Sequence, residues 1–342
     1  MNTNKVLITP ITILILLALV FPLSKIITKK RVIIIEGSSN YQPTADQPKT
    51  GESKGITNNP FAARILITPN ENENNRVNAF FLGIPGKGNS APNLTDTLMI
   101  MSVNPINKQG LLLSIPRDLV VKIPNTNYYT KINALYQQKG IDVVQNVLKE
   151  ITGLDFDYNI IIDLQGVKKI IDQIGGIDIF VEEVIYDPAF PGAGNSYQLF
   201  ALKKGEQHLD GETALKYIRS RHNPTGDFAR MSRQQKVLIA LKEQISSLHP
   251  IWNIDIVLNV WETLKNHFQT NLSLHNIKAL WQTTNDIDFE KIEFKVLDPT
   301  TDLVVADHMI LGGAKAYVLR PKKGLGDYSE IREYISNLIN PD

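Results

Sequence analysis

The chain has 342 residues, of which 43% are hydrophobic and 21% charged, so it is long enough to bury a substantial core. Its formal net charge of +1 lacks the broad basic excess of a general nucleic-acid-binding protein, so no nucleic-acid partner is expected. The absence of cysteine excludes disulfides, thiolate zinc sites and cysteine nucleophiles.

The first feature along the chain is an apolar run at residues 6–27, whose only charge is Lys25. About twenty such residues span a bilayer core, so we predict a transmembrane anchor after a short cytoplasmic tail at residues 1–5. A cleaved signal peptide is the alternative, but no small-residue cleavage site follows Phe21. The basic residues after the run would, by the positive-inside rule alone, place the rest of the chain in the cytoplasm.

Beyond the anchor, residues 28–75 are predicted to form a polar linker, and residue patterning typical of a globular domain begins near Val77. Strands are predicted at 62–68, 77–84, 97–103, 110–115, 158–163, 177–181, 289–297 and 316–319. Helices are predicted at 132–138, 141–151, 164–173, 211–220, 254–268 and 274–282, from Asp227 onward and from Tyr328 onward. The second and third core strands should form a hairpin. This alternation favours one layered α/β or α+β domain at 76–248, with residues 249–342 as a C-terminal extension packed on it.

The most basic stretch lies between Lys216 and Lys236, where six Lys or Arg residues accompany one acid, Asp227. Asp210 is predicted to cap a helix at 211–220, and Asn223 before Pro224 should end it. Asp227 is predicted to cap a second helix. Because the charge of the whole chain is almost balanced, this local excess predicts an anion-binding site.

The helical phase of the second segment sharpens this prediction. Its apolar stripe consists of Val237, Leu238, Leu241, Ile245 and Leu248. Extended backwards, the stripe contains Arg230 and Gln234, with Arg233 at its edge. A buried charge is costly unless it is paired, and cations at a helix N-terminus oppose the helix dipole. A bound anion resolves both costs; a solvated helical face is the alternative.

Three further residues lie where sites are often built, and each has a simpler interpretation. Asp96 directly precedes a strand and could ligate a metal or cap a turn. Arg117 ends a strand and could serve a site or pair with Asp118. Lys131 opens a helix and could bind an anion or remain a free surface lysine. The turn at 83–88 lacks the GK[ST] spacing of a P-loop, and the six histidines show no metal-ligand spacing.

The helices at 141–151 and 167–174 are rich in Ile, Val and Leu. Ordinary core packing explains this content, and an apolar pocket for a lipid chain is the alternative.

In combination, these segments resemble the LytR-CpsA-Psr family of cell-envelope proteins. Six segments between about Val77 and Leu248 occur in the family's order: LTDTLMIMSVNP, LLLSIPRDLVVKIP, KINALY, DYNIIIDLQGVKKIIDQIGGIDIFV, KKGEQHLDGETALKYIRSR and GDFARMSRQQKV. No single motif is decisive, but six in order are highly specific. The predicted anchor and linker also fit the family.

The resemblance implies a three-layer α-β-α sandwich with a central mixed sheet and a hydrophobic tunnel for a polyprenyl chain. It also implies a membrane-anchored phosphotransferase. Such an enzyme moves a glycopolymer from a polyprenyl-diphosphate carrier to a cell-wall acceptor such as peptidoglycan. The reaction is assisted by Mg²⁺ or Mn²⁺, and the domain lies on the extracytoplasmic side of the cell membrane. This orientation conflicts with the charge rule, and we follow the resemblance.

The resemblance assigns roles residue by residue. Catalytic residues are Asp96, Arg117 and Asp227, and Asp96 is also the metal ligand. Diphosphate-binding residues are Arg117, Lys131, Arg219, Arg221, Arg230, Arg233 and Gln234. Such a site suits phosphoryl transfer, which needs charge neutralisation and positioning more than a covalent nucleophile.

Two positions depart from the family pattern. Pro85 stands where the family often has an aspartate after the first strand, and Leu94 stands where it often has an arginine. A second metal carboxylate is therefore missing, unless another acid such as Asp118 replaces it. This loss favours one alternative function, a non-catalytic lipid-diphosphate-binding envelope regulator. A second alternative, independent of it, is hydrolysis of the polyprenyl diphosphate with water as the acceptor.

Overall fold

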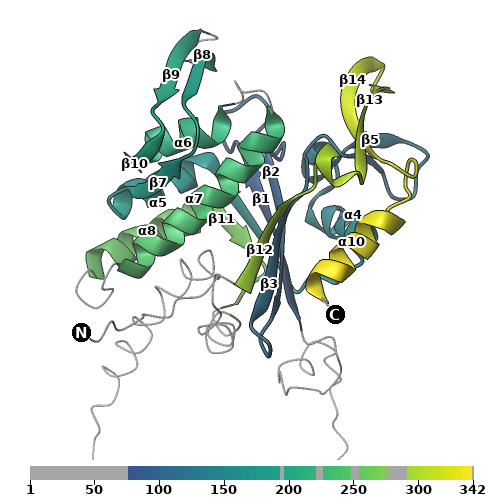
Figure 1. Cartoon of the computed structure of the whole chain (residues 1–342), viewed down its shortest axis with the longest axis horizontal. Coiled ribbons are helices and arrows are strands. Elements are labelled where there is room, and N and C mark those ends of the chain that lie inside the picture. Colours follow the sequence, from purple (N-terminus) through teal and green to yellow (C-terminus); the bar gives the residue numbers. More distant parts are fainter. Residues whose placement is uncertain are drawn as a thin grey trace, which may run out of the picture.

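The computed structural model describes residues 76–192, 196–220, 226–247, 254–273, 276 and 291–340, and Figure 1 shows their arrangement. The predicted anchor, the linker and the strand at 62–68 lie outside these residues, as does nearly all of the helix predicted at 274–282. Within the part of the chain that is described, no helix is both long and apolar enough to cross a membrane.

The middle layer is a six-stranded mixed sheet. Its strands are β1 (Val77–Ile84), β2 (Thr97–Asn104), β3 (Gln109–Ser114), β6 (Tyr158–Asp163), β11 (Phe268–Thr270) and β12 (Ile292–Val296). They are ordered β11-β6-β1-β2-β3-β12, with β1/β6 and β3/β12 parallel and the other pairs antiparallel. The predicted hairpin of β2 and β3 and the predicted central mixed sheet are both confirmed.

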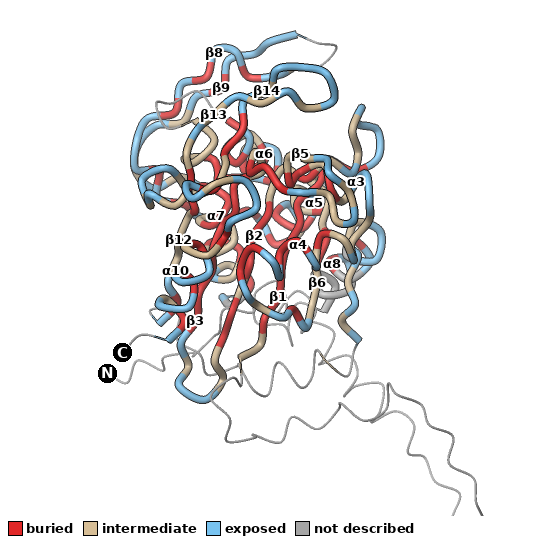
Figure 2. Tube along the Cα trace, turned by 90° about the vertical axis from the view of Figure 1, so that its right-hand side faces the viewer, coloured by how far each residue is buried: buried red, intermediate tan, exposed pale blue. Residues whose placement is uncertain are grey.

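Helices cover both faces of this sheet. One face carries α3 (Ile132–Lys139), α4 (Ile141–Thr152) and α10 (Ser329–Ile339). The other face carries α5 (Leu164–Gln173), α6 (Gly211–Arg219), α7 (Asp227–Ser247) and α8 (Ile254–His267) (Figure 1). β1 is almost wholly buried (Figure 2). Phe80 packs on the side of α3, α4 and α10, and Phe81 packs with Leu238 of α7 on the other side. The nearly continuous apolar sequence of β1 is thus explained, because a strand in a sheet covered on both sides buries side chains on both of its faces.

Four small two-stranded sheets lie around the centre. They pair β4 (Val120–Lys122) with β5 (Tyr129–Lys131), β7 (Ile177–Val181) with β10 (Gly205–Leu209), β8 (Ile185–Pro191) with β9 (Tyr197–Leu202), and β13 (Val304–Leu311) with β14 (Ala314–Pro321). A short 3-10 helix, Pro299–Thr301, precedes β13. The β8–β9 and β13–β14 hairpins rise above one end of the central sheet, on either side of it (Figure 1). Of these eight strands, only β7 and part of β14 were predicted.

Two predicted boundaries were wrong. Phe268 was placed at the end of a helix, but it begins β11 because its backbone pairs with Ile162 of β6. Asp227 was predicted to cap α7, but it is the first helical residue, and the carbonyl of Gly226 accepts the Arg230 N–H. The cap at Asp210 is confirmed, since its side chain accepts the N–H of Thr213.

Candidate active site

The strand register brings three distant motifs to one end of the central sheet. Gly83 pairs with Thr97, and Met99 pairs with Ser114. The end of β1, the start of β2 and the end of β3 therefore lie at the same edge, above which the two hairpins rise. Asp96 is fixed there because its N–H donates to the Gly83 carbonyl at 2.8 Å.

Two aspartates and two arginines form a closed arrangement of alternating charges at this edge. Asp96 Oδ1 lies 2.5 Å from Arg117 Nη1 and 3.6 Å from Arg230 Nη1. Asp227 lies 3.5 Å from Arg117 Nε through Oδ1 and 3.0 Å from Arg230 Nη2 through Oδ2. Each acid thus contacts both bases. We call these four residues the Asp–Arg ring.

The ring is anchored in the interior. The Arg230 side chain is only 3% exposed and also donates from Nη2 to the Asp96 carbonyl at 3.0 Å. Arg117 and Asp227 have side chains 16% and 21% exposed. A charge at such depth is costly unless it is paired, and two carboxylates provide the pairing here.

A second ion pair extends the ring on the α3 side. Lys131 Nζ lies 2.7 Å from Asp118 Oδ1, and Asp118 Oδ2 lies 3.9 Å from Arg117 Nε. The alternative raised for Arg117, a contact with Asp118, is therefore confirmed. The alternative raised for Lys131, a free surface lysine, was wrong, because Lys131 is paired with Asp118.

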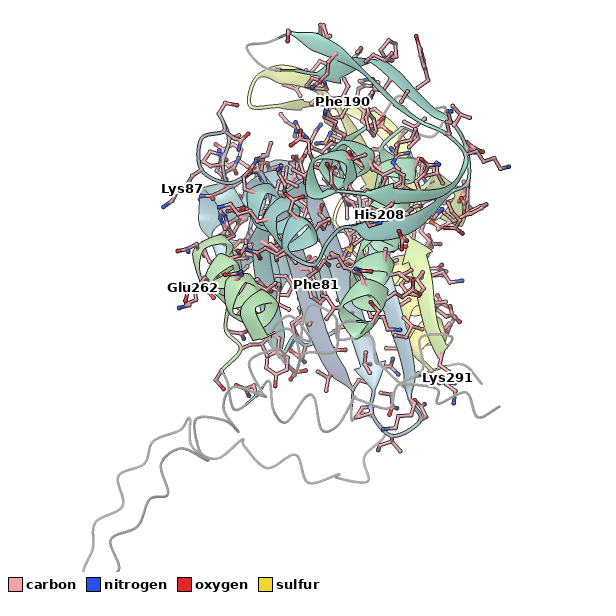
Figure 3. All side chains as sticks on the ribbon, turned by 90° about the vertical axis from the view of Figure 1, so that its left-hand side faces the viewer. Phe81, Lys87, Phe190, His208, Glu262 and Lys291 are labelled. Atoms are coloured by element: carbon pink, nitrogen blue, oxygen red, sulfur yellow. The ribbon has the colours of Figure 1, made fainter. Side chains whose placement is uncertain are left out.

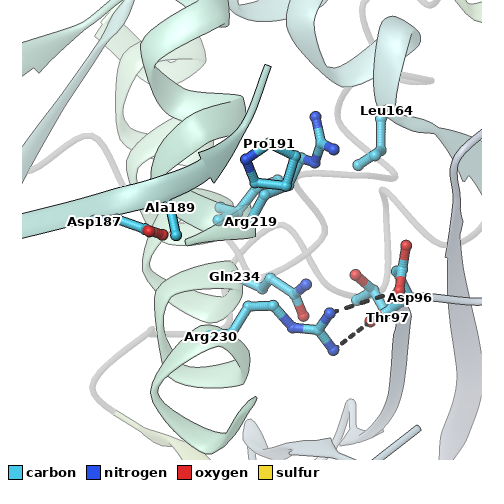
Figure 4. Close-up of a pocket in the computed structure, with 10 residues that line it drawn as sticks. Asp96, Thr97, Leu164, Asp187, Ala189, Pro191, Arg219, Arg230 and Gln234 are labelled. Carbon is cyan, nitrogen blue, oxygen red and sulfur yellow. Dashed lines mark hydrogen bonds and ion pairs between the residues drawn. The ribbon is translucent and has the colours of Figure 1, made fainter. Parts of the chain in front are cut away.

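On the other side of Arg230 lies a cavity of about 360 Å³. Its walls come from the start of β2, the start of α5, the ends of α6 and β8, and one face of α7 (Figure 4). The lining residues are Asp96, Thr97, Leu164, Asp187, Ala189, Pro191, Ile218, Arg219, Arg230 and Gln234. The prediction that Arg230 and Gln234 point inward is confirmed, since they are 2% and 7% exposed.

The polar groups of this cavity are held at its wall. The guanidinium of Arg219 lies over the Phe190 ring, 5.7 Å from its centroid. Asp187 is buried and accepts a hydrogen bond from the Ser220 hydroxyl at 2.9 Å. Among the described residues, Gln234 Oε1 is buried without a hydrogen-bond partner, so its lone pairs remain to be satisfied by a ligand or water.

An apolar cavity of about 90 Å³ adjoins the polar one. Thr97, Leu164, Ile218 and Gln234 line both, so the two share a wall. The rest of the lining is almost wholly apolar: Phe81, Leu82, Gly83, Met99, Ile162, Val167, Ile170, Val237, Leu238 and Leu241. In Figure 3, Phe81 lies deep beside the covering helices, whereas Phe190 lies near the top of the molecule.

Arg233 is not brought to this cavity. Its Nε donates to the Tyr217 carbonyl at 2.9 Å, and its Nη2 donates to the Ser220 carbonyl. These carbonyls lie at the C-terminal end of α6, where helices leave acceptors unsatisfied. Burial lowers the pKa of Arg233 and raises the pKa of Tyr217 to about 12. Arg233 therefore braces α6 against α7 and lines a separate cavity of about 250 Å³.

Two further outcomes complete the comparison with the predicted site. Arg221 lies outside the described residues. Asp187, which lines the polar cavity, was not predicted as a site residue. It lies on β8, a half-exposed strand that contains Pro188, and proline is unfavourable inside a strand. Within the described ranges, no group of three or more His, Asp or Glu side chains is arranged to hold a metal ion.

Comparison with known proteins identifies close relatives. The sequence model of the LytR_cpsA_psr family matches residues 35–323. The polyisoprenyl-teichoic acid–peptidoglycan teichoic acid transferase TagV of Bacillus subtilis (strain 168) is 31% identical over 230 residues, 66% of this chain and 56% of TagV. The regulatory protein MsrR of Staphylococcus aureus (strain COL) is 30% identical over 188 residues, 54% of each chain. The matches therefore span little more than half the length of these relatives.

The likeness extends to three dimensions. The crystal structure of B. subtilis TagV matches with a TM-score of 0.59 at 28% identity, covering 77% of this chain and 97% of the TagV chain. The central mixed sheet and its helical layers are thus those of a solved relative.

The Asp–Arg ring makes a testable energetic prediction. In a double-mutant cycle of Asp96→Asn and Arg117→Gln, we expect a coupling energy of about 1–3 kcal/mol, because the paired atoms are close and largely buried. Urea unfolding of the four proteins measures it. The matched control is the exposed pair Lys149 and Asp155, whose atoms are also 2.5 Å apart. That control should couple by less than about 0.5 kcal/mol. Equal coupling in the two cycles would contradict a buried ring.

Proposed function

The chain belongs to the LytR_cpsA_psr family, and from this premise we propose that it is a glycopolymer phosphotransferase. It would move a glycopolymer from a polyprenyl-diphosphate carrier to an acceptor hydroxyl of the cell wall, such as peptidoglycan. The name of TagV supports both the carrier and the acceptor. The observation that carries the proposal is the shared wall between a polar cavity with arginines and an apolar cavity.

The polar cavity suits the diphosphate. Arg219 and Arg230 line it from two different helices, and Gln234 adds an amide. Arginine forks bind phosphate oxygens in pairs, and a buried guanidinium gains more from an anion than an exposed one does. Arg117 and Lys131 stand on the far side of Asp96 and would approach the same group from there.

The apolar cavity suits the first part of the lipid chain. Val237, Leu238 and Leu241 of α7 line it opposite Phe81 of the sheet, with no charged side chain in the wall. Its volume of about 90 Å³ is well below the ~300 Å³ of a typical ligand pocket. A polyprenyl chain would therefore enter by moving α5, α6 and α7 away from the sheet. Each buried methylene group would contribute about 0.8 kcal/mol.

In the proposed reaction, the oxygen of the acceptor hydroxyl forms a bond to the phosphorus that carries the glycopolymer. The bond from this phosphorus to the lipid phosphate breaks, and polyprenyl phosphate leaves. The hydroxyl proton passes to a carboxylate, for which we propose Asp227 of the Asp–Arg ring. The arginines hold the diphosphate in line and neutralise the charge that develops on its oxygens.

We further propose that Mg²⁺ or Mn²⁺ accompanies the diphosphate at Asp96. Mg²⁺ is usually held by one or two carboxylates together with substrate phosphates, so Asp96 and the phosphate oxygens would form an adequate donor set. When bound, the ion would neutralise part of the diphosphate charge. Asp96 contacts two arginines, so substrate binding would have to loosen at least one of these pairs.

Two alternative functions have specific support. The name of MsrR, a regulatory protein, favours a regulator, which we propose would bind a lipid diphosphate without turning it over. The open polar cavity would also admit water as the acceptor, which gives a hydrolase. The product distinguishes the three functions. A transferase leaves glycopolymer on peptidoglycan, a hydrolase leaves free glycopolymer phosphate, and a regulator leaves the donor unchanged.

The proposed location is the cell membrane, with a single span at residues 6–27 and the domain on the extracytoplasmic side.

The arginine proposal predicts a selective loss of activity. With a polyprenyl-diphosphate glycan and peptidoglycan as substrates, Arg230→Ala and Arg117→Ala should each lower the transfer rate by about 100-fold, because each removes a charged donor from the site. Arg332→Ala is the matched control. Arg332 donates to the Glu150 carbonyl far from the site, so its removal should leave the rate unchanged. Release of polyprenyl phosphate measures the reaction. No turnover by the unaltered full-length chain would refute the enzyme.

The lipid proposal predicts a dependence on chain length. Leu238→Trp should fill the apolar cavity and lower kcat/KM for a long-chain donor by at least about tenfold, because several methylene groups lose their site. The same variant should process a donor with a very short prenyl chain normally, which also shows that it is folded. Leu199→Trp on exposed β9 is the control. Equal losses for both donors would contradict the proposed lipid site.

The metal proposal predicts a loss on chelation. EDTA should lower the transfer rate by at least about tenfold, and added Mg²⁺ should restore it, since phosphoryl transfer needs charge neutralisation. Asp96→Asn should require a higher Mg²⁺ concentration for half-maximal rate. An EDTA-treated protein that retains its full rate would remove the metal from the mechanism and leave the arginines as the source of neutralising charge.

A further inference from the structure

The β13–β14 hairpin of the C-terminal segment is tied directly to the charged site. The N–H of Leu319 donates to the Asp118 carbonyl at 2.9 Å, and Leu319 forms a parallel bridge with Leu119. Leu319 is buried, whereas the hairpin beyond it rises above the sheet (Figure 1). A segment about 200 residues away in sequence therefore stands beside the residue that follows Arg117.

One face of this hairpin is exposed and partly aromatic. Tyr317 lies two residues before Leu319, so their side chains share a face of the strand. Tyr317 pairs with His308 across the hairpin, and their rings meet edge to face, with centroids 5.9 Å apart. Ile310 extends the face outward and is 68% exposed, and Tyr317 itself is 42% exposed. We call Tyr317, His308 and Ile310 the hairpin face.

The base of the hairpin face lies next to the carboxylates of the site. The pKa of Tyr317 is raised by partial burial and then by the negative charges of Asp118 and Asp227, which places its phenol within their field. A tyrosine phenol is protonated at neutral pH even without this shift, so Tyr317 is a hydrogen-bond donor there. The negative charges of Asp118 and Asp227 therefore act on the base of the hairpin face, and the Leu319–Asp118 hydrogen bond places that base beside the charged site.

The two sides of the Asp–Arg ring differ in what they can bind. The polar cavity lies on the side of Arg219 and Gln234 and continues into the apolar cavity. Neither cavity is lined by Asp118, Lys131 or Tyr317. A transfer reaction needs a second substrate whose hydroxyl comes within about 3–3.5 Å of the reacting phosphorus. If the donor fills the two cavities, the acceptor must approach from the side on which the hairpin face stands.

We propose that the hairpin face is the acceptor subsite, and that it binds the glycan strand of the cell-wall polysaccharide. This inference rests on the proposed function. A sugar ring presents an apolar face of C–H groups and a rim of hydroxyls. The Tyr317 ring provides a flat surface for the first and its O–H provides a partner for the second. His308 holds the Tyr317 ring from the edge. A sugar stacked there directs a neighbouring hydroxyl toward Asp227.

Direct binding to the full-length chain tests the subsite without relying on turnover. The probe is a soluble peptidoglycan fragment of alternating N-acetylglucosamine and N-acetylmuramic acid, titrated by calorimetry. Tyr317→Ala should weaken binding by about tenfold, because it removes both stacking and the hydrogen bond. Tyr317→Phe keeps the ring and should weaken binding by about two- to fivefold. The ring-retaining variant keeps the test valid if the alanine variant is unstable.

The matched control is Tyr186→Ala on the β8–β9 hairpin. Tyr186 is 57% exposed and neighbours Asp187, which lines the donor cavity, so alternation turns it to the opposite face. This variant should bind the glycan as the unaltered chain does. Binding of the polyprenyl-diphosphate donor should be the same in all variants.

The outcomes separate the two proposals. The acceptor subsite is overturned if the glycan does not bind the unaltered chain. It is also overturned if the glycan binds Tyr317→Ala and Tyr317→Phe as tightly as it binds the unaltered chain. A glycan that binds through Tyr317, with no consumption of the donor by the unaltered chain, leaves the subsite standing and overturns the transferase. In the transfer assay itself, Tyr317→Ala should raise the KM for the acceptor and leave the KM for the donor unchanged.

Discussion

The structure depends on the burial of Arg230. Burying a guanidinium is costly unless it is paired, and this one has Asp227 on its own helix and Asp96 at the start of β2. These contacts fix α7 against the start of β2. Since Arg117 at the end of β3 contacts the same two acids, one set of ion pairs sets the positions of two strands and one helix. The candidate site and the contact between the helical layer and the sheet are therefore built from the same residues.

This arrangement explains how a site for a highly charged group can exist before that group binds. The four charges of the Asp–Arg ring balance, so the ring itself carries no excess of positive charge. Under the proposed function, a diphosphate would bring its own negative charge and would compete with the two carboxylates for the arginines. The acids thus hold the guanidinium groups in place for an anion, and the cost of binding is the rearrangement of existing pairs rather than the ordering of flexible side chains.

The sequence contained enough information for the central elements and for the inward arginine. β1, β2, β3 and β6 are continuous apolar runs, and the phase of α7 alone placed Arg230 and Gln234 inside, because a 3.6-residue repeat continues through polar residues. The same helical phase could not show that the Arg233 side chain goes to a different place from those of Arg230 and Gln234. Its destination depends on the unsatisfied carbonyls at the end of α6, which lies beside α7 only in three dimensions. β8, β9 and β13 were missed because they are half-exposed hairpins whose stability comes from pairing with each other and not from an apolar pattern.

Pro85 stands where the family often has an aspartate, and the consequence of this difference depends on the neighbouring strand β6. Asp163 ends β6 opposite Ile84 and lies at the same sheet edge as Asp96. It would be the natural replacement for an acid missing at Pro85. However, its carboxylate accepts the N–H of Gly166 at 2.8 Å, as the cap of α5, and contacts His267 Nδ1 at 2.9 Å. A carboxylate committed to a helix cap and a histidine has little capacity left for a metal ion. Under the proposed function, the departure at Pro85 would therefore shift the neutralisation of the diphosphate toward the arginines of the Asp–Arg ring.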